Sequence, residues 1–169
     1  MKKFLIIAVA LMLGALQLSA QKVGYISTEK ILSVIPEYKS AQAELENLGK
    51  QYQQKIESEY SKIESMYQQY QQQKANLSAQ ARQQRENEII QREQKVKELQ
   101  KTYFGQDGIM QQKSQELLNP IKERVDAAVK KIAENGNFMI IFDTSLMQGV
   151  AYARESDDLS PLVIKALGY

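Results

Sequence analysis

The feature that most constrains this chain is a long stretch, residues 38–132, in which apolar side chains recur with helical spacing. At about 100° per residue, those of the first half fall within an arc of roughly 120°. They are Tyr38, Ala41, Leu45, Leu48, Tyr52, Ile56, Tyr60, Ile63, Tyr67 and Tyr70. The other faces carry Gln, Glu, Lys and Ser, so this half is predicted to form one long amphipathic helix.

The second half repeats the pattern in a narrower stripe, an arc of about 80° if the bend expected at Pro120 is ignored. Its members are Leu99, Tyr103, Met110, Leu117, Ile121, Val125, Ala128 and Ile132. Nearly all spacings are three or four residues, which favours two antiparallel helices packed along a coiled-coil-like seam.

A polar segment separates the two stripes. Between residues 71 and 88 the only apolar residues are Leu77 and three alanines, and Asn76 and Ser78 suit a turn or a helix cap. We therefore predict a helical hairpin over residues 38–118 with its tip near residues 75–79. At 1.5 Å per residue, the outgoing arm from Tyr38 to about Lys74 would extend roughly 55 Å.

Strand-like segments occur only near the chain ends. Residues 22–27 alternate as in a strand, and Ser27 or Thr28 suits the N-cap of a short helix that runs to Ile35 and is interrupted by Pro36. Residues 138–142 (FMIIF) form a continuous apolar run, which indicates a strand covered on both faces.

Three further predictions concern the C-terminal part. Gly136 suits a left-handed end of the returning helix, and residues 149–153 are predicted to pair with residues 138–142 as a hairpin. Ser160 and Pro161 then suit an N-cap and first turn of a last helix, which ends near Leu167.

The predicted fold class is mainly α with a small β body, formed by residues 21–37 and 119–169. Three short strands cannot cover FMIIF in one copy, so identical copies are expected to build a joint core. The candidate subunit contacts are Val23, Tyr25, Ile26, Phe138, Ile140, Ile141, Phe142, Val150 and Tyr152.

The first twenty residues have the layout of a secretory signal peptide. Lys2 and Lys3 precede an apolar run at residues 4–16, and small residues lead to cleavage near Ala20. A membrane anchor is the alternative, but the run is shorter than the ~20 residues that span a bilayer. Export to the periplasm is therefore predicted.

The full sequence has 22 Lys and Arg against 20 Asp and Glu. Removing the leader takes away two lysines and no acid, so the remaining chain is electrically neutral. A neutral chain with interspersed charges argues against nucleic-acid binding, which depends on phosphate neutralisation.

Cysteine and histidine are both absent from the sequence. Disulfides, thiolate or imidazole metal sites and Ser-His-Asp or Cys-His nucleophiles are therefore excluded. Adjacent carboxylates such as Asp157 and Asp158 are expected to be caps or solvated groups, and no glycine-rich phosphate loop is present. No cofactor and no enzymatic activity are predicted.

The order and spacing of these parts resemble the OmpH/Skp family of periplasmic chaperones over the whole mature chain. The matching segments are KVGYIS at residues 22–27, Ile35-Pro36-Glu37-Tyr38, the Gln- and Glu-rich hairpin, Asn119-Pro120-Ile121, NGNFMIIFD at residues 135–143 and DLSPLVIKAL at residues 158–167. The resemblance implies a homotrimer in which three hairpins hang as tentacles from a β body. It also implies that unfolded outer-membrane β-barrel proteins are held between the tentacles without ATP.

Side chains off the stripes are the candidates for client binding, because they cannot all face the seam. They are Ile90, Phe104 and Ile109 on the returning arm, with Met66 near the edge of the outgoing stripe.

Gly105 and Gly108 interrupt the returning arm and, with Pro120, are hinge candidates. Alternatively, these small glycines permit close packing against the other arm.

Cations around the tip, such as Lys74 and Arg82, alternate with acids and are expected to form a solvated helix face. A weak membrane-surface contact by the tip is a second possibility. Two other functions remain open: an exported coiled-coil scaffold or spacer without a client, and an adaptor of the outer-membrane assembly machinery.

Overall fold

The structure, a computed structural model, describes residues 22–169, so the predicted signal peptide lies outside the described residues. The elements are β1 (Lys22–Ile26), α2 (Thr28–Ser33), α3 (Pro36–Gln73), η1 (Lys74–Asn76), α4 (Ala79–Phe104), α5 (Ile109–Gly136), β2 (Phe138–Asp143), η2 (Glu155–Asp157) and α6 (Ser160–Leu167). They form two compact units, the first of residues 22–31 and 127–169 and the second of residues 32–126.

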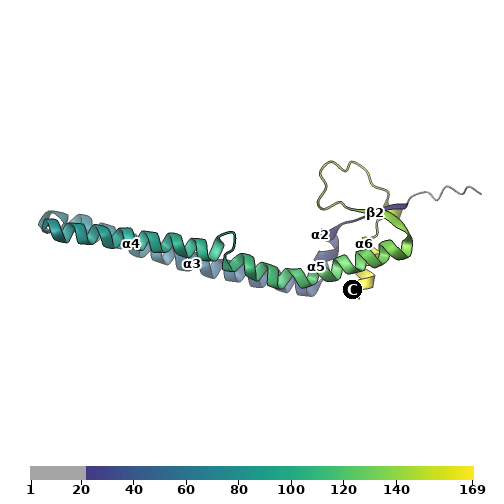
Figure 1. The fold of residues 1–169 in the computed structure, drawn as a ribbon, viewed down its shortest axis with the longest axis horizontal. Helices are drawn as coiled ribbons and strands as arrows, with labels where there is room; N and C mark the ends of the chain where they lie inside the picture. The colour runs from purple at the N-terminus through teal and green to yellow at the C-terminus, as the bar shows by residue number, and fades with distance from the viewer. Residues whose placement is uncertain (1–21) are drawn as a thin grey trace, which may run out of the picture. The chain divides into compact units, whose positions relative to one another are not determined.

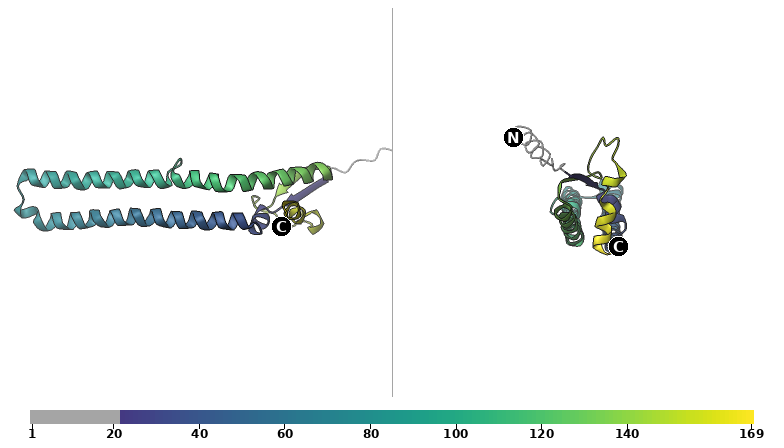
Figure 2. Two further views of the ribbon diagram at one scale, coloured as in Figure 1. Left: turned by 90° about the horizontal axis from the view of Figure 1, so that it is seen from below. Right: turned by 90° about the vertical axis from the view of Figure 1, so that its right-hand side faces the viewer.

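The second unit is a hairpin of long helices, in which α3 runs beside α4 and the first part of α5 (Figures 1 and 2). Pro36 is the first residue of α3, where its fixed φ fits the helix and its missing N–H is not needed. With 38 residues, α3 is about 57 Å long. The predicted long antiparallel helices are confirmed.

The turn at the tip is short and polar. After η1, Leu77 is extended, and the Ser78 hydroxyl caps α4 by accepting a hydrogen bond from the Ala81 N–H at 3.2 Å. The chain therefore reverses over residues 74–78, close to the predicted tip.

A single row of side chains fills the seam between the arms. Its main cluster consists of Ile56, Ile63, Tyr70, Ile89 and Val96, with Met66, Leu77 and Tyr103 packed against it. Nearer the root, Tyr52 stacks on Tyr103 with 4.1 Å between ring centroids. Tyr60 and Tyr67 belong to the predicted stripe but remain exposed, because a two-helix seam covers a narrower arc than the stripe occupies.

The first unit is built on a parallel pair of strands. β1 and β2 pair from Lys22 with Phe138 to Ile26 with Asp143, with one irregularity after Lys22. Parallel neighbours need a long crossover, and here the whole helical hairpin forms that connection. On the other side of β1, the Leu159 N–H donates to the Tyr25 carbonyl at 2.8 Å.

The predicted strand at residues 149–153 is wrong. These residues are irregular, Gly149 has a φ of 87°, and Val150 and Tyr152 are exposed. The reason is that β2 pairs with β1 rather than with the segment that follows it, so the loop has no strand partner within residues 22–169.

Two predictions about helix ends also need correction. Asn137, with a φ of 52°, takes the left-handed conformation predicted for Gly136, which is instead the last residue of α5. Gly136 has a different role, since a Cβ there would clash with the Phe138 ring. Ser160 is the first residue of α6 rather than its N-cap, and its hydroxyl accepts a hydrogen bond from the Ser27 N–H at 2.8 Å.

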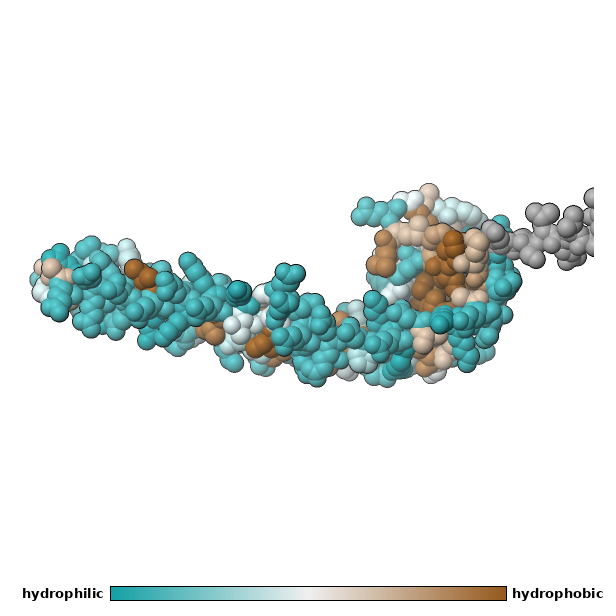
Figure 3. All heavy atoms as spheres, viewed as in Figure 1, coloured by the Kyte–Doolittle hydropathy of each residue, from teal (hydrophilic) through white to brown (hydrophobic). Residues whose placement is uncertain are grey.

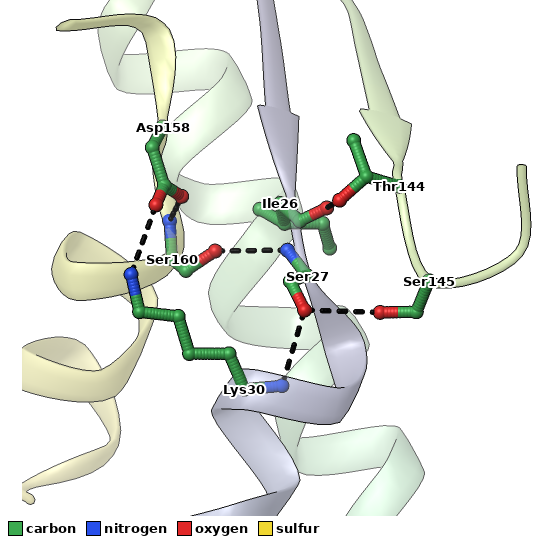
Figure 4. A network of polar contacts seen from close by, with 7 residues as sticks. All are labelled: Ile26, Ser27, Lys30, Thr144, Ser145, Asp158 and Ser160. Carbon is green, nitrogen blue, oxygen red and sulfur yellow. Dashed lines mark hydrogen bonds and ion pairs between the residues drawn. The ribbon is translucent and has the colours of Figure 1, made fainter. Parts of the chain in front are cut away.

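A polar network closes the first unit around the start of α2 (Figure 4). The first three N–H groups of α2, on Thr28, Glu29 and Lys30, donate to Asp143 Oδ1 at 3.1 Å, Ser145 Oγ at 3.0 Å and Ser27 Oγ at 3.1 Å. Asp158 accepts from the Ser160 N–H at 2.8 Å and from Lys30 Nζ at 3.0 Å. The side chain just before α2 and two side chains distant in sequence thus satisfy groups that every helix start leaves open.

Truncation in the seam should destabilise the hairpin. Ile56→Ala is expected to lower the free energy of unfolding by about 2–4 kcal/mol, because Ile56 is fully packed between the arms. Ile90→Ala, at a half-exposed position, should change it by less than about 0.5 kcal/mol. Urea unfolding followed by far-UV circular dichroism compares the two, and equal losses would contradict the seam described here.

Acid should destabilise the first unit through Asp143 and Asp158. Partial burial acts to raise each pKa, but hydrogen bonds outweigh it and hold both pKa values below the ordinary 3.8. Thr28 and Ser145 donate to Asp143, whereas Ser160 and Lys30 donate to Asp158 (Figure 4). Such carboxylates stabilise the folded state above their unfolded pKa, and this stabilisation is lost as the pH falls through the folded pKa. The free energy of unfolding should therefore decline below about pH 4.

Asp143→Asn should remove about 1 kcal/mol at pH 7 and flatten the acid dependence. Asp107→Asn, in an exposed loop of the second unit, is the control. Unfolding midpoints measured from pH 7 to pH 2 test this expectation, and an Asp143→Asn curve parallel to that of the unmodified protein would refute it.

Candidate functional surfaces

The first unit exposes an apolar surface around β2. Met139, Ile140 and Phe142 are 52%, 42% and 43% exposed, although the sequence predicted that this strand is covered on both faces. Figure 3 shows apolar residues gathered over β2 and the loop after it. Within the described chain β1 is the only strand paired with β2, so the other edge of β2 has no partner strand. Such a patch on a small unit indicates a contact surface.

A groove of about 270 Å³ runs into this surface between the strands and the loop. Its apolar lining comes from Val23, Tyr25, Phe142, Met147, Val150 and Tyr152. Partial burial, followed by the nearby carboxylates of Asp158 and Glu155, raises the pKa of Tyr25. Its neutral phenol adds a polar tip to an apolar wall.

Most candidate subunit contacts lie on this surface. Val23, Ile140, Phe142, Val150 and Tyr152 are exposed, whereas Tyr25, Phe138 and Ile141 are half-buried. Ile26 is the exception, because it is buried in the interior of its own chain.

Sequence reasoning missed Met139, Leu146 and Met147. All three are exposed apolar side chains in or just after β2. For Leu146 and Met147 a signal was available in the sequence. Turns are usually polar, so large apolar residues in a loop indicate a contact surface.

On the hairpin, three of the four candidate client-binding residues are accessible. Ile90, Phe104 and Ile109 are 49%, 46% and 37% exposed. Met66 instead packs against the seam cluster, so most of its apolar surface is already covered. The two exposed tyrosines, Tyr60 and Tyr67, were missed because their helical phase assigned them to the seam.

Several polar groups near the tip have partners within the arms. Arg85 bonds Glu88 at 3.1 Å, and Lys74 Nζ lies 5.5 Å from the centre of the Tyr70 ring. Tyr70 donates a short hydrogen bond to Glu86, which, with burial, raises the pKa of Tyr70. These contacts support the predicted solvated face, and a weak membrane contact at the tip stays a prediction.

The returning arm is interrupted at the predicted glycines. Gly105 donates to the Lys101 carbonyl at 2.8 Å and ends α4, and Gly108 donates to the Gly105 carbonyl at 2.9 Å before α5 begins. A Cβ at either glycine would first meet backbone of this loop or of the preceding turn, not α3. Close packing against the other arm therefore does not explain these glycines. Pro120, by contrast, lies inside the continuous α5.

Other kinds of site find no support in the described part of the chain. Residues 22–169 contain no cluster of three or more carboxylates placed to hold a metal ion. Among the same residues, no helix is long and apolar enough to span a membrane.

Comparison with known proteins identifies the family. The family model described as outer membrane protein (OmpH-like) matches residues 22–167. The chain belongs to the OmpH-like family. It is 27% identical to the chaperone protein Skp of Yersinia enterocolitica over 167 residues, which is 98% of each chain.

A solved structure supports the same fold. A crystal structure from Caulobacter crescentus CB15, described as a candidate outer membrane chaperone (OmpH-like), superposes with a TM-score of 0.67 at 12% identity. The match covers 88% of this chain and 85% of that one. The predicted fold class, long helices with a small sheet, is thereby confirmed, and membership of this chaperone family confirms that the chain is not an enzyme.

If the loop at Gly105–Gly108 is a hinge, its amides should exchange with solvent far faster than those in the packed arm. Hydrogen exchange of a peptide covering residues 105–112 is expected to be at least about tenfold faster than that of residues 89–96. Deleting residues 105–108, which joins Phe104 to Ile109, should remove the fast-exchanging signal. Equal protection of the two segments in the unmodified protein would exclude a hinge here.

Proposed function

We propose that this protein is a periplasmic holding chaperone that shelters unfolded outer-membrane β-barrel proteins without ATP. The observation that carries the proposal is the family match over residues 22–167, joined to a relative named a chaperone that aligns over nearly its whole length. The layout of residues 1–20 supports export, and no phosphate-cradling glycine loop is present in the sequence.

The working form is proposed to be a homotrimer built through the first unit. The unpaired edge of β2 and the exposed side chains of Ile140 and Phe142 support assembly, because a further strand and apolar cover would satisfy both. The number three follows from the resemblance to the OmpH/Skp family. Each copy would then contribute one hairpin to a shared shelter.

The hairpin supports loose holding rather than tight docking. Ile90, Phe104 and Ile109 are separated along the arm, so each would give a weak contact with a client. Several such contacts on several arms combine into substantial avidity, while each one breaks easily. The interruption at Gly105–Gly108 would let the arms adapt to clients of different size.

The proposal is tested by diluting a urea-unfolded β-barrel protein into buffer with and without the chaperone and recording light scattering. Aggregation should be suppressed without ATP and should level off near one trimer per client, with the mass of the complex given by size-exclusion light scattering. No suppression at any ratio would refute the holding function and would favour a scaffold or spacer.

Disrupting the assembly should abolish holding. The variant Ile140→Asp with Phe142→Asp is expected to run as a single chain and to lose suppression, since buried carboxylates would be unpaired in the interface. Tyr152→Asp is a milder second variant, because Tyr152 is 84% exposed and contributes little to its own chain's core. Ile90→Asp on the hairpin should leave the mass unchanged. An unmodified protein that already runs as a single chain would contradict the trimer.

A further inference from the structure

The two sides of the hairpin seam differ in chemistry. On one side, three ion pairs join the arms, and in each pair α3 supplies the acid and the returning arm supplies the base. They are Glu37 with Arg124 at 3.1 Å, Glu44 with Lys113 at 3.5 Å and Glu59 with Arg92 at 4.0 Å. This side is named the ion-pair side.

The opposite side carries the exposed large apolar residues of α3 and α4. Measured from Ile63 at the seam centre, Tyr60 and Tyr67 are rotated by about +60° and +40°, whereas Glu59 is rotated by about −40°. Measured from Ile89, Ile90 and Phe104 lie at about +100° and +60°, and Arg92 at about −60°. Because the arms are antiparallel, positive rotations about the two helix axes lead to the same side of the hairpin.

Two contacts agree with this assignment. The Tyr60 hydroxyl donates across the seam to Gln100 Oε1 at 3.4 Å, and Gln100 lies on the positive side of α4. The Phe104 and Tyr52 rings lie nearly perpendicular to each other, with 6.5 Å between their centroids. The aromatic side is therefore defined by Tyr60, Tyr67, Ile90 and Phe104, which are between 42% and 49% exposed.

The cross-arm contacts also set the levels of these residues along the hairpin. Phe104 lies level with Tyr52, and Ile90 lies between the levels of Glu59 and Tyr70, close to Tyr67. At 1.5 Å per residue, the aromatic side thus has three apolar spots at intervals of roughly 10 Å. Figure 3 shows that exposed apolar residues on this part of the chain are isolated among hydrophilic ones.

The size and spacing of these apolar spots indicate which kind of partner can bind to the aromatic side. Four half-exposed side chains offer roughly 400 Å² at most, well below the ~800 Å² per partner of a stable interface between folded proteins. A second copy of this chain or a folded partner would therefore be held poorly. An unfolded chain places its apolar side chains independently, so it can fill separate spots one at a time. Tyrosine and phenylalanine suit such contacts, because rigid rings lose little conformational entropy on binding.

We propose that the aromatic side is the surface of the hairpin that holds unfolded chains, and that the ion-pair side faces away from them. The inference rests on the proposed holding function and adds Tyr60 and Tyr67 to its binding residues. Met66 has no part in it, since it packs against the seam beside Gln69 and Arg85.

Site-specific photo-crosslinking tests the sidedness directly. A benzophenone side chain replaces either Tyr67 or Gln69, which lie at nearly the same level but on opposite sides of the seam. With a urea-unfolded β-barrel protein as the probe, crosslinking from position 67 should exceed that from position 69 by about fivefold or more. Equal yields, or a higher yield from position 69, would overturn the proposal.

A matched pair of variants tests the energetic role. Tyr60→Ser, Tyr67→Ser, Ile90→Ser and Phe104→Ser together should weaken client binding by about tenfold, while mass and helix content stay unchanged. Glu37→Gln, Glu44→Gln and Glu59→Gln together should change binding less than about twofold. If the first variant loses helix content, the set without Phe104→Ser replaces it, since Phe104 contacts Tyr52.

The two proposals fail separately. If the unmodified protein does not hold the client, the proposed function is wrong. If the unmodified protein holds the client and the aromatic-side variant holds it equally well, this inference alone is wrong.

Discussion

Packing between two antiparallel helices is the interaction on which the rest of this structure depends. A two-helix seam covers one row of side chains per arm, here centred on Ile56, Ile63 and Val96. An apolar residue outside that narrow arc finds little in its own hairpin to pack against. The same geometry that gives a long, thin hairpin therefore leaves Tyr60, Tyr67, Ile90 and Phe104 accessible. Exposure of these residues is a consequence of the architecture rather than a defect in packing.

Parallel pairing of β1 with β2 has a comparable effect in the first unit. It brings together residues separated by the entire hairpin and leaves an apolar strand with one open edge. Side-chain oxygens of Ser27, Asp143 and Ser145 then close the N-terminus of α2, so this helix start is satisfied within the chain. The open edge of β2 and its apolar side chains are not, since Met139, Ile140 and Phe142 remain exposed. This difference explains why assembly, rather than further folding, is the natural way to cover the surface.

Charge has a modest and local role. The inter-arm ion pairs are exposed, and exposed pairs contribute little stability, with a median of about 0–1 kcal/mol. Their placement on one side is nevertheless informative, because it makes one side of the hairpin hydrophilic and leaves the other for apolar contacts. The charges thus distinguish the two sides of the hairpin, while apolar packing in the seam provides most of its stability.

The amino-acid sequence by itself determined the elements with strong periodicity. Spacing of threes and fours indicated both arms, Ser78 marked the start of α4, and Pro36 marked the start of α3, because these signals are local and act through backbone geometry. The exposure of Ile90, Phe104 and Ile109 also followed from helical phase. Gly105 and Gly108 marked the interruption, since glycine weakens a helix wherever it falls.

Only the tertiary structure decided which segments pair and which residues the seam leaves uncovered. Residues 149–153 have an alternating pattern, yet a strand requires a partner edge, and β2 pairs with β1. Tyr67 and Met66 are neighbours in sequence with opposite outcomes. They lie about 100° apart around α3, on opposite sides of the seam, and Met66 packs against the seam cluster while Tyr67 stays exposed. Periodicity in the sequence specifies which face of a helix is apolar. The width of the helix packed against it determines how much of that apolar face is buried.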